Sequence, residues 1–146
     1  MFKRDRKASR KINGIIIHCT ASRKNATIFQ LCRDWAVRLG WRSAPGYHKL
    51  VFEDGESVRL EEDNAVVNGA KGYNADHLHI SWVGGHTRCD ITKEQKIAVY
   101  KEVLKWQAIY ELQDWQVKGH NEVSNKECPR FNVHDFLNEM REMGVC

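Results

Sequence analysis

Residues 12–18, INGIIIH, decide the fold that the rest of the chain has to complete. The three consecutive isoleucines are β-branched and apolar, a pattern typical of a short central strand buried on both faces. The run ends on His18, and the ends of strands are where α/β sheets place their ligands. The remaining chain must therefore supply both the neighbouring strands and any chemical partners of His18.

The sequence on either side predicts alternating strands and helices. Strands are predicted at residues 47–53, 57–60, 77–83 and 115–119, and helices at residues 27–39, 92–110 and from 132 onward. Thr27 and Thr92 each precede a glutamine by three residues, which is capping-box spacing at a helix start. Asp54-Gly55 is a strong hairpin signal and makes at least one strand pair antiparallel. We predict a single α/β domain with a central mixed sheet flanked by about three helices.

The first helix carries an apolar stripe that we expect to face the core. Its members recur at helical spacing and are Ile28, Leu31, Cys32, Trp35 and Leu39. Gly40 follows the stripe and is expected to end the helix, because glycine readily adopts the left-handed conformation there.

Charge is distributed unevenly along the 146 residues. Residues 1–11 hold six Lys or Arg and one Asp, or +5, whereas the whole chain carries +4, so residues 12–146 carry −1. We therefore divide the chain into a basic N-terminal arm, 1–11, and a near-neutral domain, 12–146. The near-neutral domain argues against a nucleic-acid partner. The favoured interpretation of the arm is a solvated tail, and the alternative is a docking element for an acidic partner.

The distribution of apolar residues bears on where in the cell the protein is expected. The sequence contains no apolar run long enough to span a membrane, so we expect no stable membrane insertion. The basic N-terminus lacks the apolar stretch of a signal peptide, which predicts a protein that is cytoplasmic when synthesised. We expect a monomer.

Five cysteines, an odd number at wide spacing, argue against a disulfide framework. Cys32 is expected in the core, and Cys146 is terminal. Cys128 is the cysteine with suitable neighbours for chemistry, because it shares the polar segment 119–129, GHNEVSNKECP, with His120. This segment shows no apolar period and is predicted to be a loop.

Two imidazoles and one thiolate could hold a catalytic zinc ion. His18 and His120 each end a predicted strand, and Cys128 would complete a set of three protein ligands with an open fourth position. Each histidine has a simpler interpretation as a structural residue. His77 and His79 share one face of a strand and could form a metal-binding pair, but exposed polar surface is the favoured interpretation.

The ordered motifs of the chain resemble those of type-2 N-acetylmuramoyl-L-alanine amidases, a zinc family that includes small phage lysozymes and is related to peptidoglycan recognition proteins. The resemblance covers nearly everything from Ile12 to Leu137. Its markers are IIIHCTAS at 15–22, RLGW at 38–41, GYH at 46–48, the Asp54-Gly55 turn, AKGYN at 70–74, WVGG at 82–85 and GHNEVSNKECPRF at 119–131.

The resemblance implies a fold, a reaction and specific residues. It makes His18, His120 and Cys128 the ligands of Zn²⁺, and Tyr47 and Lys126 the catalytic helpers. The implied reaction is hydrolysis of the amide bond between N-acetylmuramic acid and L-alanine in bacterial peptidoglycan, in a phage or prophage endolysin that acts on the cell wall after release. The residues proposed to bind substrate are Lys71, Tyr73 and Asn74.

The implied chemistry agrees with the residue types. Zinc makes water a competent nucleophile at neutral pH. The oxyanion that forms on attack needs a positive or hydrogen-bond-donating group nearby, which Lys126 and Tyr47 could supply. Without the resemblance, a core tyrosine and a solvated lysine would be the simpler interpretations. A peptidoglycan-binding module without activity, and a regulator acting through protein contacts, are the alternative functions.

Three positions depart from the family pattern. The family often has Trp-His where this chain has Trp35-Ala36, and a histidine where it has Gly69. The position of His79 is commonly glycine. The first two departures bear on substrate affinity and stem-peptide preference, and the predicted ligands and helpers are untouched.

Overall fold

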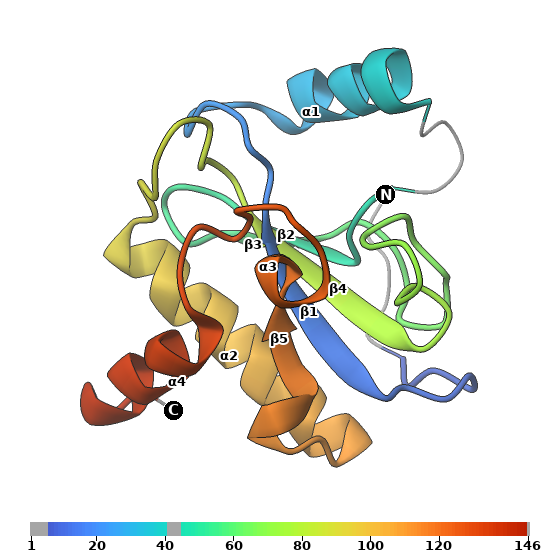
Figure 1. Ribbon diagram of the computed structural model, residues 1–146, viewed down its shortest axis with the longest axis vertical. Helices are drawn as coiled ribbons and strands as arrows, with labels where there is room; N and C mark the ends of the chain where they lie inside the picture. The colour runs from blue at the N-terminus through green and yellow to red at the C-terminus, as the bar shows by residue number, and fades with distance from the viewer. Residues whose placement is uncertain (1–5, 41–44, 146) are drawn as a thin grey trace.

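A five-stranded sheet in the order β3-β2-β4-β1-β5 forms the centre of the computed structural model, which describes residues 6–40 and 45–145 (Figure 1). The strands are β1 Gly14–Cys19, β2 Lys49–Val51, β3 Ser57–Arg59, β4 His77–Trp82 and β5 Val117–Gly119. The helices are α1 Ile28–Asp34, the π-helical η1 Trp35–Leu39, α2 Lys93–Tyr110, the 3₁₀ turn η2 Asp114–Gln116, α3 His120–Val123 and α4 Val133–Glu142. Residues 1–5 of the basic arm, Trp41 and Cys146 lie outside the described residues.

The sheet is mixed, as predicted. β1 lies between β4 and β5 and runs parallel to both, while β2 runs parallel to β4. β2 and β3 form the antiparallel hairpin predicted from Asp54-Gly55, and Gly55 adopts a φ of +89° in the turn. The predicted single α/β domain and its strands are confirmed, with strand ends that differ by a few residues.

Helices α2 and α4 pack on one face of the sheet, as Figure 1 shows. Paired residues of adjacent strands share a face, so alternate residues of β1 and β4 point toward these helices. The core between them includes Ile15, Ile17, Leu78, Ile80, Trp82, Val99, Val103, Trp106, Phe136 and Leu137. Thr27, Thr92 and Asn132 cap α1, α2 and α4, which confirms the three predicted helix starts.

The opposite face carries a smaller apolar cluster that includes Leu31, Trp35, Tyr47 and Leu50. The predicted apolar stripe of the first helix is only partly right, because Cys32 is exposed and Ile28 and Leu39 are 41% and 50% exposed. Two physical reasons explain the difference. The helix packs on a small cluster rather than a full core, and its last turn is π-helical, which shifts the side-chain period after Asp34.

The segment at residues 8–10 is attached to the domain. The backbone N–H of Ala8 donates to the Tyr110 hydroxyl over 2.8 Å, and the same hydroxyl donates to Asp63 over 2.7 Å. Arg10 donates to the carbonyls of Asp63 and Ala75 at 2.9 Å each. The expected solvated tail is therefore wrong for these residues, because their polar groups are hydrogen-bonded to the rest of the protein, while a boundary near residue 11 stays a prediction.

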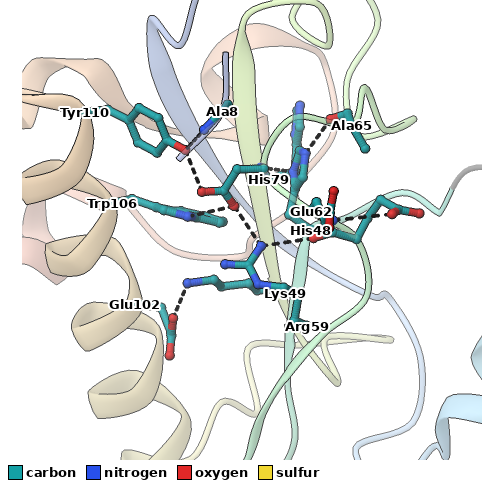
Figure 2. A network of polar contacts seen from close by, with 12 residues as sticks. Ala8, His48, Lys49, Arg59, Glu62, Ala65, His79, Glu102, Trp106 and Tyr110 are labelled. Carbon is teal, nitrogen blue, oxygen red and sulfur yellow. Dashed lines mark hydrogen bonds and ion pairs between the residues drawn. The ribbon is translucent and has the colours of Figure 1, made fainter. Parts of the chain in front are cut away.

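A buried polar network lies behind this attachment (Figure 2). The Asp63 carboxylate is 2% exposed and accepts hydrogen bonds from Arg59, Tyr110 and the indole N–H of Trp106. Lys49 pairs with Glu102 beside the Trp106 ring. The network ties α2 to the strands and to the loop that follows β3.

Candidate metal centre

Parallel pairing of β1 and β5 brings His18 and His120 together. Ile17 is opposite Gly119, and the residue after each of them is a histidine. The two imidazole rings lie with their centroids 4.7 Å apart. His18 is 1% exposed, whereas His120 is half-buried at the start of α3. This edge of the sheet, at the carboxyl ends of its parallel strands, is where α/β folds bind ligands.

Cys128 reaches the same place from the segment after α3. The backbone N–H of Cys19 donates to Cys128 Sγ over 3.0 Å, and the Trp82 indole N–H donates to the Pro129 carbonyl over 3.2 Å. One potential ligand atom from each of His18, His120 and Cys128 lies within 4.8 Å of the other two. In the described part of the chain, this is the cluster of His, Cys, Asp or Glu side chains that could hold a metal ion.

The segment 119–129 is not wholly the predicted loop, because it opens with the helical turn α3. The Glu122 carboxylate accepts the Gly119 backbone N–H over 2.7 Å and so satisfies a donor at the start of that turn. Sequence periodicity could not show this helix, since it is four residues long.

The imidazoles of His18 and His120 are neutral at pH 7, and the neutral imidazole is the form that binds metal. Burial, together with His79 and His120, holds the pKa of His18 well below its usual value. Burial and the Lys126 ammonium lower the pKa of His120. Contact with the Cys19 thiol and burial raise the pKa of the Cys128 thiol in the metal-free protein. A bound cation would reverse that preference, because coordination favours the thiolate.

Tyr47 lies beside His18 and close to Cys128. Its ring centroid is 5.0 Å from that of His18 and 5.6 Å from that of Trp35. Burial, with the nearby Cys128 and Cys19, raises the pKa of its hydroxyl, so the group stays protonated. The hydroxyl donates to the Cys19 carbonyl over a long 3.5 Å and also interacts with the Ser81 side chain, so a neutral hydrogen-bonding group lies at the site.

Lys126 has an exposed side chain on the segment between α3 and Cys128. Its charge lies close enough to lower the pKa values of both His120 and Cys128. The ammonium therefore acts electrostatically on the candidate metal centre from the solvent side.

The loop that contains Lys71, Tyr73 and Asn74 borders the centre through Gly69. A Cβ built on Gly69 would lie 2.2 Å from Nδ1 of His79, whose ring contacts His18. Lys71 is exposed, and the half-buried Tyr73 packs its ring on His77. The Asn74 side chain accepts the Ala70 backbone N–H over 2.8 Å and closes the loop. The substrate-binding role of these three residues stays a prediction.

His79 is the functional candidate that sequence reasoning missed. The expected polar surface at this position is wrong, because β4 lies between β2 and β1 and the Gly69 loop covers the ring, which leaves His79 fully buried. Two signals in the sequence could have indicated that His79 is buried. It lies between the apolar Leu78 and Ile80, and it occupies a family position that is commonly glycine.

Comparison with known proteins agrees with this geometry. Residues 8–131 match the family described as N-acetylmuramoyl-L-alanine amidase. The endolysin of Escherichia phage T7 is 28% identical over 127 residues, which cover 83% of this chain and 82% of that protein. The endolysin of Enterobacteria phage K11 is 26% identical over the same coverage.

Solved structures share the fold. The endolysin N-acetylmuramoyl-L-alanine amidase LysCS from Clostridium intestinale has a TM-score of 0.76 at 25% identity, covering 94% of this chain and 86% of LysCS. Drosophila peptidoglycan recognition protein PGRP-LB has a TM-score of 0.70 at 17% identity, covering 96% and 85% of the two chains. With a family match that extends over most of its length, the chain belongs to the N-acetylmuramoyl-L-alanine amidase family.

Proposed function

We propose that this chain carries out the reaction of its family with zinc, hydrolysing the amide bond between the lactyl group of N-acetylmuramic acid and the L-alanine of the stem peptide. One observation carries the proposal. His18, His120 and Cys128 come from three separate segments of the sequence and converge with their ligand atoms within 4.8 Å of one another.

The donor set fits zinc. Two neutral imidazoles and one thiolate are borderline-soft ligands, and three protein ligands leave a position for water or substrate. The Cys19 N–H stabilises negative charge on Cys128 Sγ, as a thiolate ligand requires. The half-buried His120 and Cys128 leave one side of the centre accessible, whereas the buried His18 anchors the other side.

A zinc ion held by these three side chains would supply the Lewis acidity that activates water and polarises the amide carbonyl. The protein's own groups then act on the charge that develops. Tyr47 donates a hydrogen bond from a fixed, buried hydroxyl, and Lys126 adds a positive charge from the solvent side. Both would stabilise the oxyanion that forms on the carbonyl oxygen.

We assign part of the substrate's chain to a cavity that is lined by the segment after β1 and by the first helix. It has a volume of about 570 Å³ and begins at Ala21, three residues after His18. Arg23 and Arg38 line it, and their cationic guanidinium groups suit the carboxylates of a stem peptide. Asp34 neutralises part of this charge by pairing with Arg38.

Action on the cell wall is the corresponding physiological role, as in an endolysin. Four curated relatives named endolysin, from phages T7, K11, T3 and KP32, are 26–28% identical to this chain. In the part of the chain that the structure describes, no helix has both the length and the apolar character needed to cross a membrane.

Digestion of purified peptidoglycan tests the proposal. An amidase releases new L-alanine amino termini without new reducing sugar ends, so both groups should be quantified before and after incubation. Treatment with a chelator should stop the release, and added zinc should restore it. Binding to peptidoglycan without any release of amino termini would favour the binding-module function instead.

A further inference from the structure

The buried ring of His79 is directly hydrogen-bonded to a candidate metal ligand. β1 and β4 pair in parallel with His18 opposite Ser81 and Ile16 opposite His79, so His18 and His79 project from the same face of the sheet. Nδ1 of His79 lies 2.9 Å from Nε2 of His18, and the ring centroids are 5.1 Å apart. Both side chains are at most 1% exposed, so bulk water does not compete for this bond.

The surroundings hold the His79 ring in one place. Gly69 leaves the space that the ring occupies, since any Cβ there would lie 2.2 Å from Nδ1. On the other side, His48 stacks on His79 with the ring planes 12° apart. Nδ1 of His48 accepts the His79 backbone N–H over 3.0 Å, and Nε2 of His48 lies 2.8 Å from the Ala65 carbonyl (Figure 2).

We infer that His79 is a positioning residue for His18: its Nδ1 accepts the Nε2–H of His18, so that His18 Nδ1 is left unprotonated and able to bind a metal. A neutral imidazole carries one N–H, and the nitrogen that binds a metal must be the other one. A hydrogen bond from the free nitrogen of a ligating histidine fixes both its tautomer and its ring orientation. The inference rests on the metal centre of the proposed function.

The opposite arrangement of the pair is incompatible with that role. If His79 Nδ1–H donated to His18 Nε2, the His18 proton would sit on Nδ1 and block the metal. The far nitrogen of His79, Nε2, is buried and has no hydrogen-bond partner among the described residues in either arrangement. The ring thus has a hydrogen bond to His18 through Nδ1 and an interaction with the Tyr73 backbone, and a bound metal would favour the direction in which His18 Nδ1 carries no proton.

Two substitutions at His79 separate the hydrogen bond from the packing. His79→Asn can place its Oδ1 near the position of Nδ1 and so keeps an acceptor. His79→Phe keeps a planar ring of similar size and removes the acceptor. Competition with a chromogenic chelator measures the zinc affinity of each variant and the parent. We expect His79→Phe to bind zinc about 10–100-fold more weakly, the usual cost of losing such a partner, and His79→Asn to stay close to the parent.

Nitrogen-15 NMR of the histidine rings tests the same inference on the unsubstituted protein. In the zinc-loaded parent, His18 should show a protonated Nε2 and a metal-bound Nδ1. Zinc on Nε2 of His18, or parental affinity in His79→Phe, would overturn the positioning role while leaving the metal centre intact. A parent protein that binds no zinc would overturn the metal centre itself, and the role of His79 with it.

Discussion

The backbone N–H of Cys19 donates to Sγ of Cys128 across 3.0 Å, although 109 residues separate them in the sequence. Cys19 directly follows His18, so β1 both carries the candidate ligand His18 and hydrogen-bonds the candidate ligand Cys128. This contact links the end of β1 to the C-terminal segment that carries Cys128. The three candidate ligands can therefore come together only after the sheet has formed.

Replacing Tyr47 with phenylalanine should keep the metal and lose most of the activity. The hydroxyl is buried beside His18 and is a transition-state donor in the proposed reaction. Losing one such donor typically costs about 10²–10³ in rate, or about 3–4 kcal/mol. Turnover on a soluble muropeptide measures the effect, with Tyr100→Phe, in the core of the opposite face, as the control. Unchanged turnover in Tyr47→Phe would remove the hydroxyl from the mechanism.

Lys126→Ala should also retain zinc and lower turnover, because it removes a positive charge near the developing oxyanion. The charge acts from an exposed position, so raising the salt concentration should weaken its contribution and narrow the gap between variant and parent. Lys101→Ala, which removes an exposed charge from α2, is the matched control. Equal turnover of Lys126→Ala and parent at low salt would contradict the assignment.

Substituting Arg10 should destabilise the domain. Its guanidinium donates to the carbonyls of Asp63, Ala75 and His77 at 2.9–3.1 Å, and hydrogen bonds from charged groups contribute about 1.5–3 kcal/mol. Urea unfolding should therefore show a lower free energy of unfolding for Arg10→Ala. The exposed neighbour Lys11→Ala removes the same charge and should stay close to the parent. Equal losses from both variants would mean that the segment contributes only net charge.

The stability of the protein should fall on acidification through His48. Burial lowers the pKa of this imidazole from 6.5 to about 4, with smaller opposing effects from the Ala65 carbonyl and Asp63 and further lowering by Arg10 and Arg59. At a pH between these two pKa values, His48 is protonated in the unfolded chain and neutral in the folded protein. The free energy of unfolding should therefore drop by up to about 1.4 kcal/mol per pH unit as the pH decreases.

Urea unfolding of the metal-free protein at about pH 7 and about pH 5 checks this. His48→Gln lacks the titrating group and should show a shallower loss of stability than the parent. His86 is exposed, so His86→Gln serves as the control for removing an imidazole. A parent and a His48→Gln variant with the same pH dependence would exclude His48 as the source.

Local sequence signals predicted most of the fold. The isoleucine run, the Asp54-Gly55 turn and the capping threonines each act within a few residues, so their outcome needed no knowledge of the tertiary structure. The buried stripe of α1 was harder to predict, because the π-helical turn after Asp34 changes the side-chain period.

The site was predictable only in part from the chain itself. His18 and His120 end strands, but their adjacency depends on the order β4-β1-β5. Residue types alone suggested a zinc set with Cys128, and the family resemblance was needed to favour it over structural histidines. The role of His79 depends on two non-local facts, the central place of β4 in the sheet and the missing side chain at Gly69. Arg10 was assigned to a tail because its partners lie more than 50 residues away.

Metal content measured together with amidase activity tests the central claim most directly. The parent should carry one zinc per chain and release L-alanine amino termini from purified peptidoglycan, and Cys128→Ala should lose both properties. Cys89→Ala, which removes an exposed thiol, should retain both. A Cys128→Ala protein with full zinc content and full activity would contradict the assignment of His18, His120 and Cys128 as the catalytic metal centre.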